Sequence, residues 1–172
     1  MQTNRYSTAS KRIWASIVDG IVFMPFLLID RFLISPTESE YFVVGWQMLS
    51  VIIPLLYSIV AHYKYGQTIG KWVAGVQVVD ISESHKINLK QAIVRASFYL
   101  AIKLAAVCYY LFLVVTNGDK AYFFEGFNDL AGTLIMVWFL LNLVTMYSNK
   151  KSRAIHDFLA QSVVIASPQA KR

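Results

Sequence analysis

Four long apolar stretches dominate this sequence and limit what it can fold into. A membrane-spanning helix needs about 20 mostly apolar residues, because the hydrocarbon core of a bilayer is roughly 30 Å thick. Stretches of this kind run over about 12–34, 42–63, 95–116 and 130–147. Only 15% of the residues are charged, whereas a soluble domain has about 25%. The sequence therefore predicts an all-α membrane protein with four transmembrane helices and a single domain over 1–172.

The charges of the connecting segments alternate in sign along the chain. Lys and Arg gather in the N-terminal segment, in the loop 64–94 and in the tail 148–172, whereas the other two loops are mainly acidic. Because cytoplasmic loops carry an excess of Lys and Arg, both termini are expected in the cytoplasm. This sorting also accounts for the net charge of +6, so we do not expect nucleic acid as a partner. The first apolar stretch follows basic residues, as in a signal peptide, but its length favours a retained span.

The loop 64–94 contains a glycine motif. Three residues separate Gly66 from Gly70, and Lys71 is followed by Trp72, so the spacing does not fit a phosphate-binding P-loop. We expect Gly66, Gly70 and Gly75 to permit tight turns and a close approach to the membrane face.

The same loop is expected to contain local structure. Thr68–Val73 predicts a short interfacial helix with Lys71 directed toward the lipid headgroups. The valines after Gly75 predict a strand that ends at Asp80, and a second strand over Ser162–Ala166 is expected to pair with it. Asn88 and Gln91 resemble a capping box, so the next helix is expected to begin near Leu89.

Asp19 lies inside the first span, where a carboxylate costs roughly +2.5 to +3.5 kcal/mol at a helix centre. We therefore expect it to face the protein interior and to have a partner. Arg12, two turns earlier, leans toward the cytoplasm and away from Asp19. On the third span, Lys103 lies at nearly the depth of Asp19, and Arg95 lies near the cytoplasmic end. An internal partnership of Lys103 is favoured over snorkelling to the interface.

The tail contains further polar groups near the membrane surface. Asp157 lies at the level of Arg12, so either an ion pair joins the chain ends or Asp157 is solvated beside a basic run. His156 can titrate near neutral pH, although a lone interfacial histidine is more often structural. Ser152, His156 and Asp157 are too close together for a catalytic triad, and no spacing resembles a zinc site. We expect no enzyme activity, no metal and no cofactor.

These residues together resemble the RDD family of bacterial membrane proteins, which is named for one arginine and two aspartates. Arg12 and Asp19 match the arginine and aspartate of the first span, and Arg95 resembles the arginine that opens a later span. Gly66–Asp80, with Thr68 and Lys71 in its Gly-x-Thr-x-Gly-Lys part, resembles the family's loop motif. In RAIHDFLAQSVVI, Asp157 would be the second aspartate. This segment departs from the family at Ala160–Ser162, where Ala-Gly-Thr is frequent.

The resemblance implies a multi-pass protein of the bacterial cytoplasmic membrane. Transport has been proposed for the family, and some members resemble sodium–proton antiporters. We therefore expect transport of ions or small solutes, with Asp19 binding a monovalent cation or proton and with Lys103 or Arg95 as the competing charge. Four spans make a thin wall for a transport path, so a homo-oligomer in the lipid bilayer is expected. The alternative is a non-transporting scaffold or assembly factor whose buried charges fix helix packing.

Overall fold

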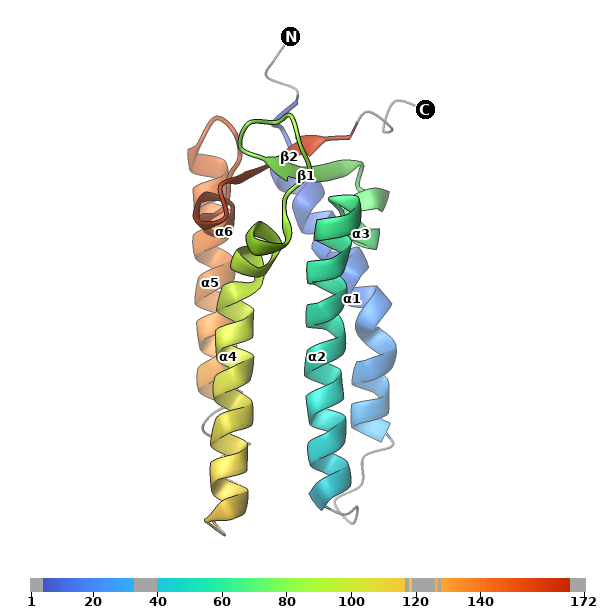
Figure 1. The fold of residues 1–172 in the computed structure, drawn as a ribbon, viewed down its shortest axis with the longest axis vertical. Helices are drawn as coiled ribbons and strands as arrows, with labels where there is room; N and C mark the ends of the chain where they lie inside the picture. The colour runs from blue at the N-terminus through green and yellow to red at the C-terminus, as the bar shows by residue number, and fades with distance from the viewer. Residues whose placement is uncertain (1–4, 33–39, 117, 119–125, 127, 168–172) are drawn as a thin grey trace.

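The structure is a computed structural model that describes residues 5–32, 40–116, 118, 126 and 128–167 (Figure 1). Within these residues, long helices are joined at one end by shorter elements. The long helices are α1 (Ala9–Phe32), α2 (Glu40–Tyr65), α4 (Leu89–Val115) and α5 (Asn128–Ser148). The shorter elements are α3 (Ile69–Val73), β1 (Val76–Asp80), α6 (Ile155–Leu159) and β2 (Ser162–Ala166). The predicted helical fold with a short sheet is confirmed.

Three of the long helices, α2, α4 and α5, are long and apolar enough to cross a membrane. The predicted apolar stretches coincide with α1, α2, α4 and α5, with ends shifted by a few residues. The predicted end of the first stretch, 33–34, lies outside the described residues, as does most of the two acidic loops. α1 and α2 continue through Pro25 and Pro54.

Large apolar side chains cover the outer surface of the long helices. Trp14, Leu104, Val115 and Val144 are each more than half exposed. A single soluble domain rarely leaves so large an apolar surface in water. Hydrocarbon is the solvent that suits this surface, which is the physical reason for the membrane assignment.

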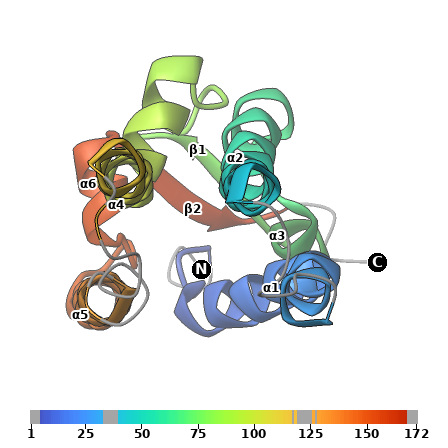
Figure 2. The same ribbon diagram turned by 90° about the horizontal axis from the view of Figure 1, so that it is seen from below.

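The best-packed part of the protein is the two-stranded sheet. β1 and β2 are antiparallel, with Val76 opposite Ala166 and Asp80 opposite Ser162, so the predicted pairing is confirmed. The sheet crosses the ends of the long helices (Figure 2). One face packs on a cluster that contains Val78 and Ile87, and the other packs near Tyr6. Because both faces are covered, the strands are almost continuously apolar.

Local signals set the helix starts around the sheet. Asn88 and Gln91 form the predicted capping box at the start of α4, and Thr68 caps α3 by accepting a hydrogen bond from the Lys71 amide. Gly66 and Gly75 have φ values of +70° and +65°, a conformation that glycine adopts without steric cost. The predicted tight turns at these two glycines are confirmed.

Candidate functional site

A buried charge cluster joins both ends of the chain below the sheet. Asp157 on α6 is fully buried. Its Oδ2 lies 2.7 Å from Nη1 of Arg12 on α1, and its Oδ1 accepts a hydrogen bond from Nη1 of Arg95 on α4. The same Arg95 nitrogen donates to the Ser162 hydroxyl on β2 at 2.5 Å. The predicted Arg12–Asp157 pair is therefore present, and Arg95 completes it.

The first turn of α6 positions Asp157. The Ala154 amide donates to Asp157 Oδ2 at 2.9 Å, which satisfies one of the free N–H groups at a helix start. Arg153 donates from Nη2 to the Asp157 carbonyl and from Nε to the Ser162 carbonyl. Asn149 accepts from the Arg153 amide at 2.8 Å. Hydrogen bonds to side-chain and backbone atoms therefore both hold α6 in place.

The cluster stabilises the ionised form of Asp157. Burial by itself would raise the pKa of Asp157, but the guanidinium groups of Arg12 and Arg95 outweigh this effect and hold that pKa well below its usual range. A buried carboxylate is stable only when charges and hydrogen bonds replace its water. Asp157 is therefore permanently ionised at physiological pH and acts as a fixed link between α1, α4 and α6.

His156 is neutral in this environment. Its Nε2 lies 3.1 Å from Nη2 of Arg12. Because a guanidinium has only donors, Nε2 must accept and the proton must sit on Nδ1. The pKa of His156 is lowered to about 3, chiefly by burial and also by the charges of Arg95 and Arg12, although the charge of Asp157 opposes this shift. The structure therefore favours a structural role for His156 over titration near neutral pH, because burial and two neighbouring arginines disfavour the protonated ring.

Asp19 has a different set of partners. The half-buried carboxylate accepts three hydrogen bonds from neutral donors. Thr68 Oγ1 lies 2.6 Å from Oδ2, and the Gly70 amide nitrogen lies 2.8 Å from Oδ1. Tyr57 Oη on α2 lies 3.2 Å from Oδ1 and itself accepts from the Ile69 amide at 2.7 Å. Asp19 therefore joins α1 to α2 and to the start of α3.

Gly70 makes this arrangement possible. A Cβ atom at this position would lie 2.0 Å from the Ala15 carbonyl oxygen and 2.8 Å from Cγ of Asp19. Any other residue would push α3 away from α1. The predicted close approach at Gly70 is confirmed, but its partner is α1 rather than the membrane face.

The expected pairing of Lys103 with Asp19 is wrong. Lys103 lies on an exposed face of α4, and Asp19 has no ion pair within the described part of the chain. Depth and helical face matched Lys103 to Asp19, but the loop folds back and brings α3 to the carboxylate instead. Lys71 lines a partly open pocket with Arg12 and His156, while its neighbour Trp72 is 62% exposed. The contact of Lys71 with the lipid headgroups stays a prediction.

Several partners were not predicted from the sequence. Tyr57, Ser162, Arg153 and Asn149 all contribute hydrogen bonds to the two carboxylate sites. Gly70 contacts Asp19 through its backbone amide, so no side chain in the sequence indicates this contact. One sequence signal could have indicated an anion partner. Thr68 stands before a short apolar helix, where an N-cap and free backbone amides are expected.

Comparisons with known proteins give one match. The RDD family model matches residues 6–161, a range that includes both carboxylate sites. No curated protein and no solved structure matches the chain. Among the described residues, no group of three or more His, Cys, Asp or Glu side chains is arranged to hold a metal ion.

Proposed function

Because this chain belongs to the RDD family, we propose that it is a transporter of the bacterial cytoplasmic membrane in which Asp19 binds a proton or a monovalent cation. The observation that carries this proposal is the contrast between the two carboxylates. Two arginines neutralise Asp157, whereas Asp19 is held by neutral donors. Among the described residues, no arginine or lysine forms an ion pair with Asp19, which leaves its carboxylate available to a cation.

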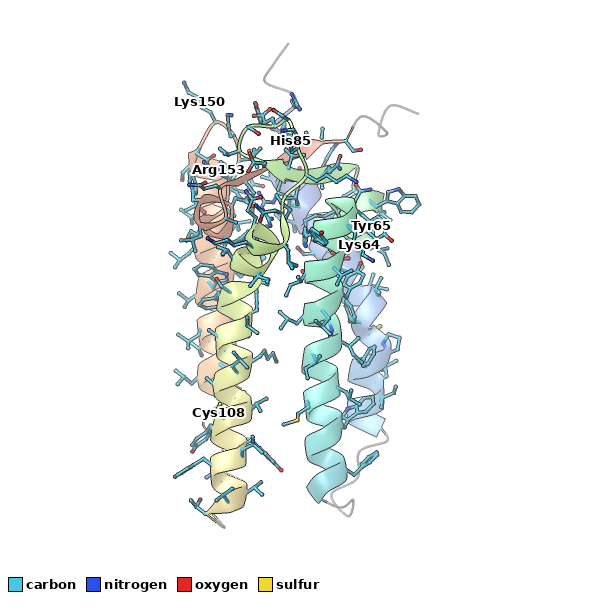
Figure 3. The ribbon with its side chains drawn as sticks, in the orientation of Figure 1. Lys64, Tyr65, His85, Cys108, Lys150 and Arg153 are labelled. Carbon is cyan, nitrogen blue, oxygen red and sulfur yellow. The ribbon has the colours of Figure 1, made fainter. Side chains whose placement is uncertain are left out.

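The proposed topology has four spans, α1, α2, α4 and α5, with both termini in the cytoplasm. The start of α1 lies beside the sheet, and β2, the last strand along the chain, is part of it (Figure 1). Lys64, Lys150 and Arg153 gather at the same end of the molecule, while Cys108 lies far along α4 (Figure 3). This distribution supports a position of the sheet on the cytoplasmic side of the membrane, because Lys and Arg are concentrated on that side of membrane proteins.

The atoms around Asp19 suit a small hard cation or a proton. The Tyr57 hydroxyl lies within hydrogen-bond distance of one carboxylate oxygen of Asp19 and the Thr68 hydroxyl within that distance of the other, and hard cations prefer oxygen ligands. Occupancy by a cation or proton would compete with the hydrogen bonds from Thr68 and Gly70. Binding at Asp19 would thus loosen α3 from α1, which couples occupancy of the site to a movable element.

The proposed transporter acts as a homo-oligomer and carries out no covalent chemistry. Its long helices leave most of their apolar side chains exposed, so a second copy can cover part of this surface and complete a path. Neither an enzyme activity nor a cofactor is needed for this role.

Proton flux in proteoliposomes tests the proposal. The purified protein is reconstituted with an entrapped pH indicator, and pulses of Na⁺, K⁺ or Li⁺ are added across a pH gradient. We expect cation-dependent proton flux in the wild type and a loss of about ten-fold or more in Asp19→Asn, because the amide carries no charge to share. Asp129→Asn, which changes an exposed carboxylate on α5, is the matched control and keeps the flux.

The second candidate is a membrane scaffold or assembly factor, favoured by the exposed apolar helix faces. In that case the wild type shows no flux, and Asp19→Asn lowers the folded yield or the recovery of a bound membrane protein. Flux that is the same in wild type and Asp19→Asn would also rule out the transport role of Asp19.

A further inference from the structure

A partly open pocket of about 120 Å³ lies at the sheet end of the helices. This is many times the ~10–15 Å³ that one water molecule needs. The polar residues that line it come from α1, α3, α4, α5 and α6, namely Arg12, Ser16, Lys71, Tyr99, Asn142 and His156. No carboxylate lines the pocket, so its polar lining favours an anion over a cation.

Lys71 is the charge in this pocket that lacks a partner. Arg12 contacts Asp157, the Ser152 carbonyl and His156. By contrast, the Lys71 ammonium has no hydrogen bond or ion pair with the residues that the structure describes. The pKa of Lys71 is lowered to about 7, chiefly by burial and next by the charge of Arg95, against a smaller opposing effect of Asp19. A half-buried cation without an ion pair is costly.

The other polar groups of the pocket complement an oxyanion. The neutral His156 carries its proton on Nδ1, because Nε2 accepts from Arg12, so this ring nitrogen is a donor. Arg12 and Lys71 supply only donors. Phosphate groups are bound in proteins by such combinations of a guanidinium, an ammonium and neutral N–H groups.

We propose that this pocket binds the phosphate group of an anionic ligand, with Lys71 as the charge that pairs with it and with Arg12 and His156 as further donors. The apolar part of the lining, Ile13, Phe139 and Met146, gives room for an acyl chain beside the headgroup. Anionic phospholipid and free phosphate share the recognised chemistry. The site is separate from Asp19, and the proposal stands whether or not the protein transports an ion.

Thermal unfolding of the full chain in detergent, after removal of copurified lipid, tests the proposal. The probes are phosphatidylglycerol, phosphatidylcholine, inorganic phosphate and chloride at equal ionic strength, all at pH 6.5, where Lys71 is largely protonated. We expect phosphatidylglycerol or phosphate to raise the melting temperature, and phosphatidylcholine and chloride to leave it unchanged. An effect of phosphatidylglycerol alone identifies a lipid site, and an effect of phosphate identifies a site that needs no acyl chain.

Charge-matched variants locate the binding. Lys71→Gln is expected to weaken the apparent affinity for the anionic probes about ten-fold or more, because it removes a charge-assisted contact. Lys71→Arg retains binding, and Lys64→Gln, which removes an exposed lysine, leaves it within about two-fold of the wild type.

A second variant keeps the test decisive if Lys71→Gln does not fold. Ser16→Leu reduces the pocket volume and keeps all charges, so it must also weaken binding. Equal affinity in the wild type and in the pocket variants overturns the proposal, and so does a wild type that responds to none of the anionic probes.

Discussion

At the scale of single residues, the partners of a carboxylate determine what that carboxylate can do. Asp157 is enclosed by Arg12 and Arg95 and is fully buried. Asp19 is half-buried and is held by two hydroxyl groups and one amide. Removing the charge of Asp157 therefore leaves two buried arginines without their ion pair, whereas removing that of Asp19 breaks no ion pair among the described residues.

Asp157→Asn is expected to destabilise the protein strongly. The variant leaves Arg12 and Arg95 without a counter-charge, and breaking a buried ion pair costs about 3–5 kcal/mol. The loss is measured as a fall in melting temperature of the purified protein. Asp129→Asn is the control, because Asp129 is exposed on α5, so less than about 1 kcal/mol is expected. Equal losses in the two variants would contradict the assignment.

His156→Gln is expected to reduce the sensitivity of the fold to acid. The folded-state pKa of His156 is about 3, whereas its unfolded value is near 6.5. Between these values the unfolded chain binds a proton and the folded protein does not. This group therefore lowers stability as the pH falls through that window, by about 1.4 kcal/mol per pH unit.

Glutamine keeps an acceptor for Arg12 and cannot take up this proton. Unfolding measured between pH 7 and pH 4.5 should show a smaller slope in His156→Gln than in the wild type. His85→Gln, at an exposed position, is the control and retains the wild-type slope. An unchanged slope in His156→Gln would show that protonation of His156 does not cause the loss of stability at low pH.

At the scale of elements, α3 depends on its neighbours. A helix of five residues is far below the length at which isolated helices persist in water. It is held by the Thr68 cap, by the hydrogen bonds to Asp19 and Tyr57, and by the close contact of Gly70 with α1. α3 is thus an element whose position depends on one carboxylate.

Gly70→Ala tests this dependence. The added methyl group would lie 2.0 Å from the Ala15 carbonyl oxygen, so α3 must move and weaken its hydrogen bond to Asp19. Overpacking of this kind costs about 1–3 kcal/mol, which is measured as a lower melting temperature. Gly132→Ala on α5 meets nothing within 4 Å and is expected to be neutral or slightly stabilising, because alanine favours the helix. If both variants had the wild-type melting temperature, the tight contact would not exist.

At the scale of the whole molecule, the packed sheet and the apolar helix surfaces lie in different parts of the protein. The sheet, α3 and α6 form the polar, well-packed end, where segments far apart in the sequence meet (Figures 1 and 2). The long helices extend from this end and leave large apolar side chains exposed along their length. The proposed transport activity and the proposed oligomeric state depend on the whole molecule, because the helices of one copy are too few to enclose a path through the bilayer.

The elements follow closely from sequence patterns. Apolar runs of membrane-spanning length predict the long helices, Asn88 and Gln91 predict the start of α4, and paired valine-rich segments predict the sheet. The shared level of Arg12 and Asp157 at the membrane surface indicates an ion pair as one of two alternatives, the other being a solvated Asp157. Each of these predictions depends on composition or local spacing, which the chain carries without reference to its folded path.

Sequence alone determined that the chain enters a membrane, where its helices and strands lie, and which charges lie near the same depth. Tertiary structure decided which of those charges meet. Asp19 contacts α3 rather than Lys103, and Lys71 lines a pocket with Arg12, because the loop folds back under α1. Depth and helical periodicity place a residue at a level and on a face. They do not specify which backbone amide another segment brings there.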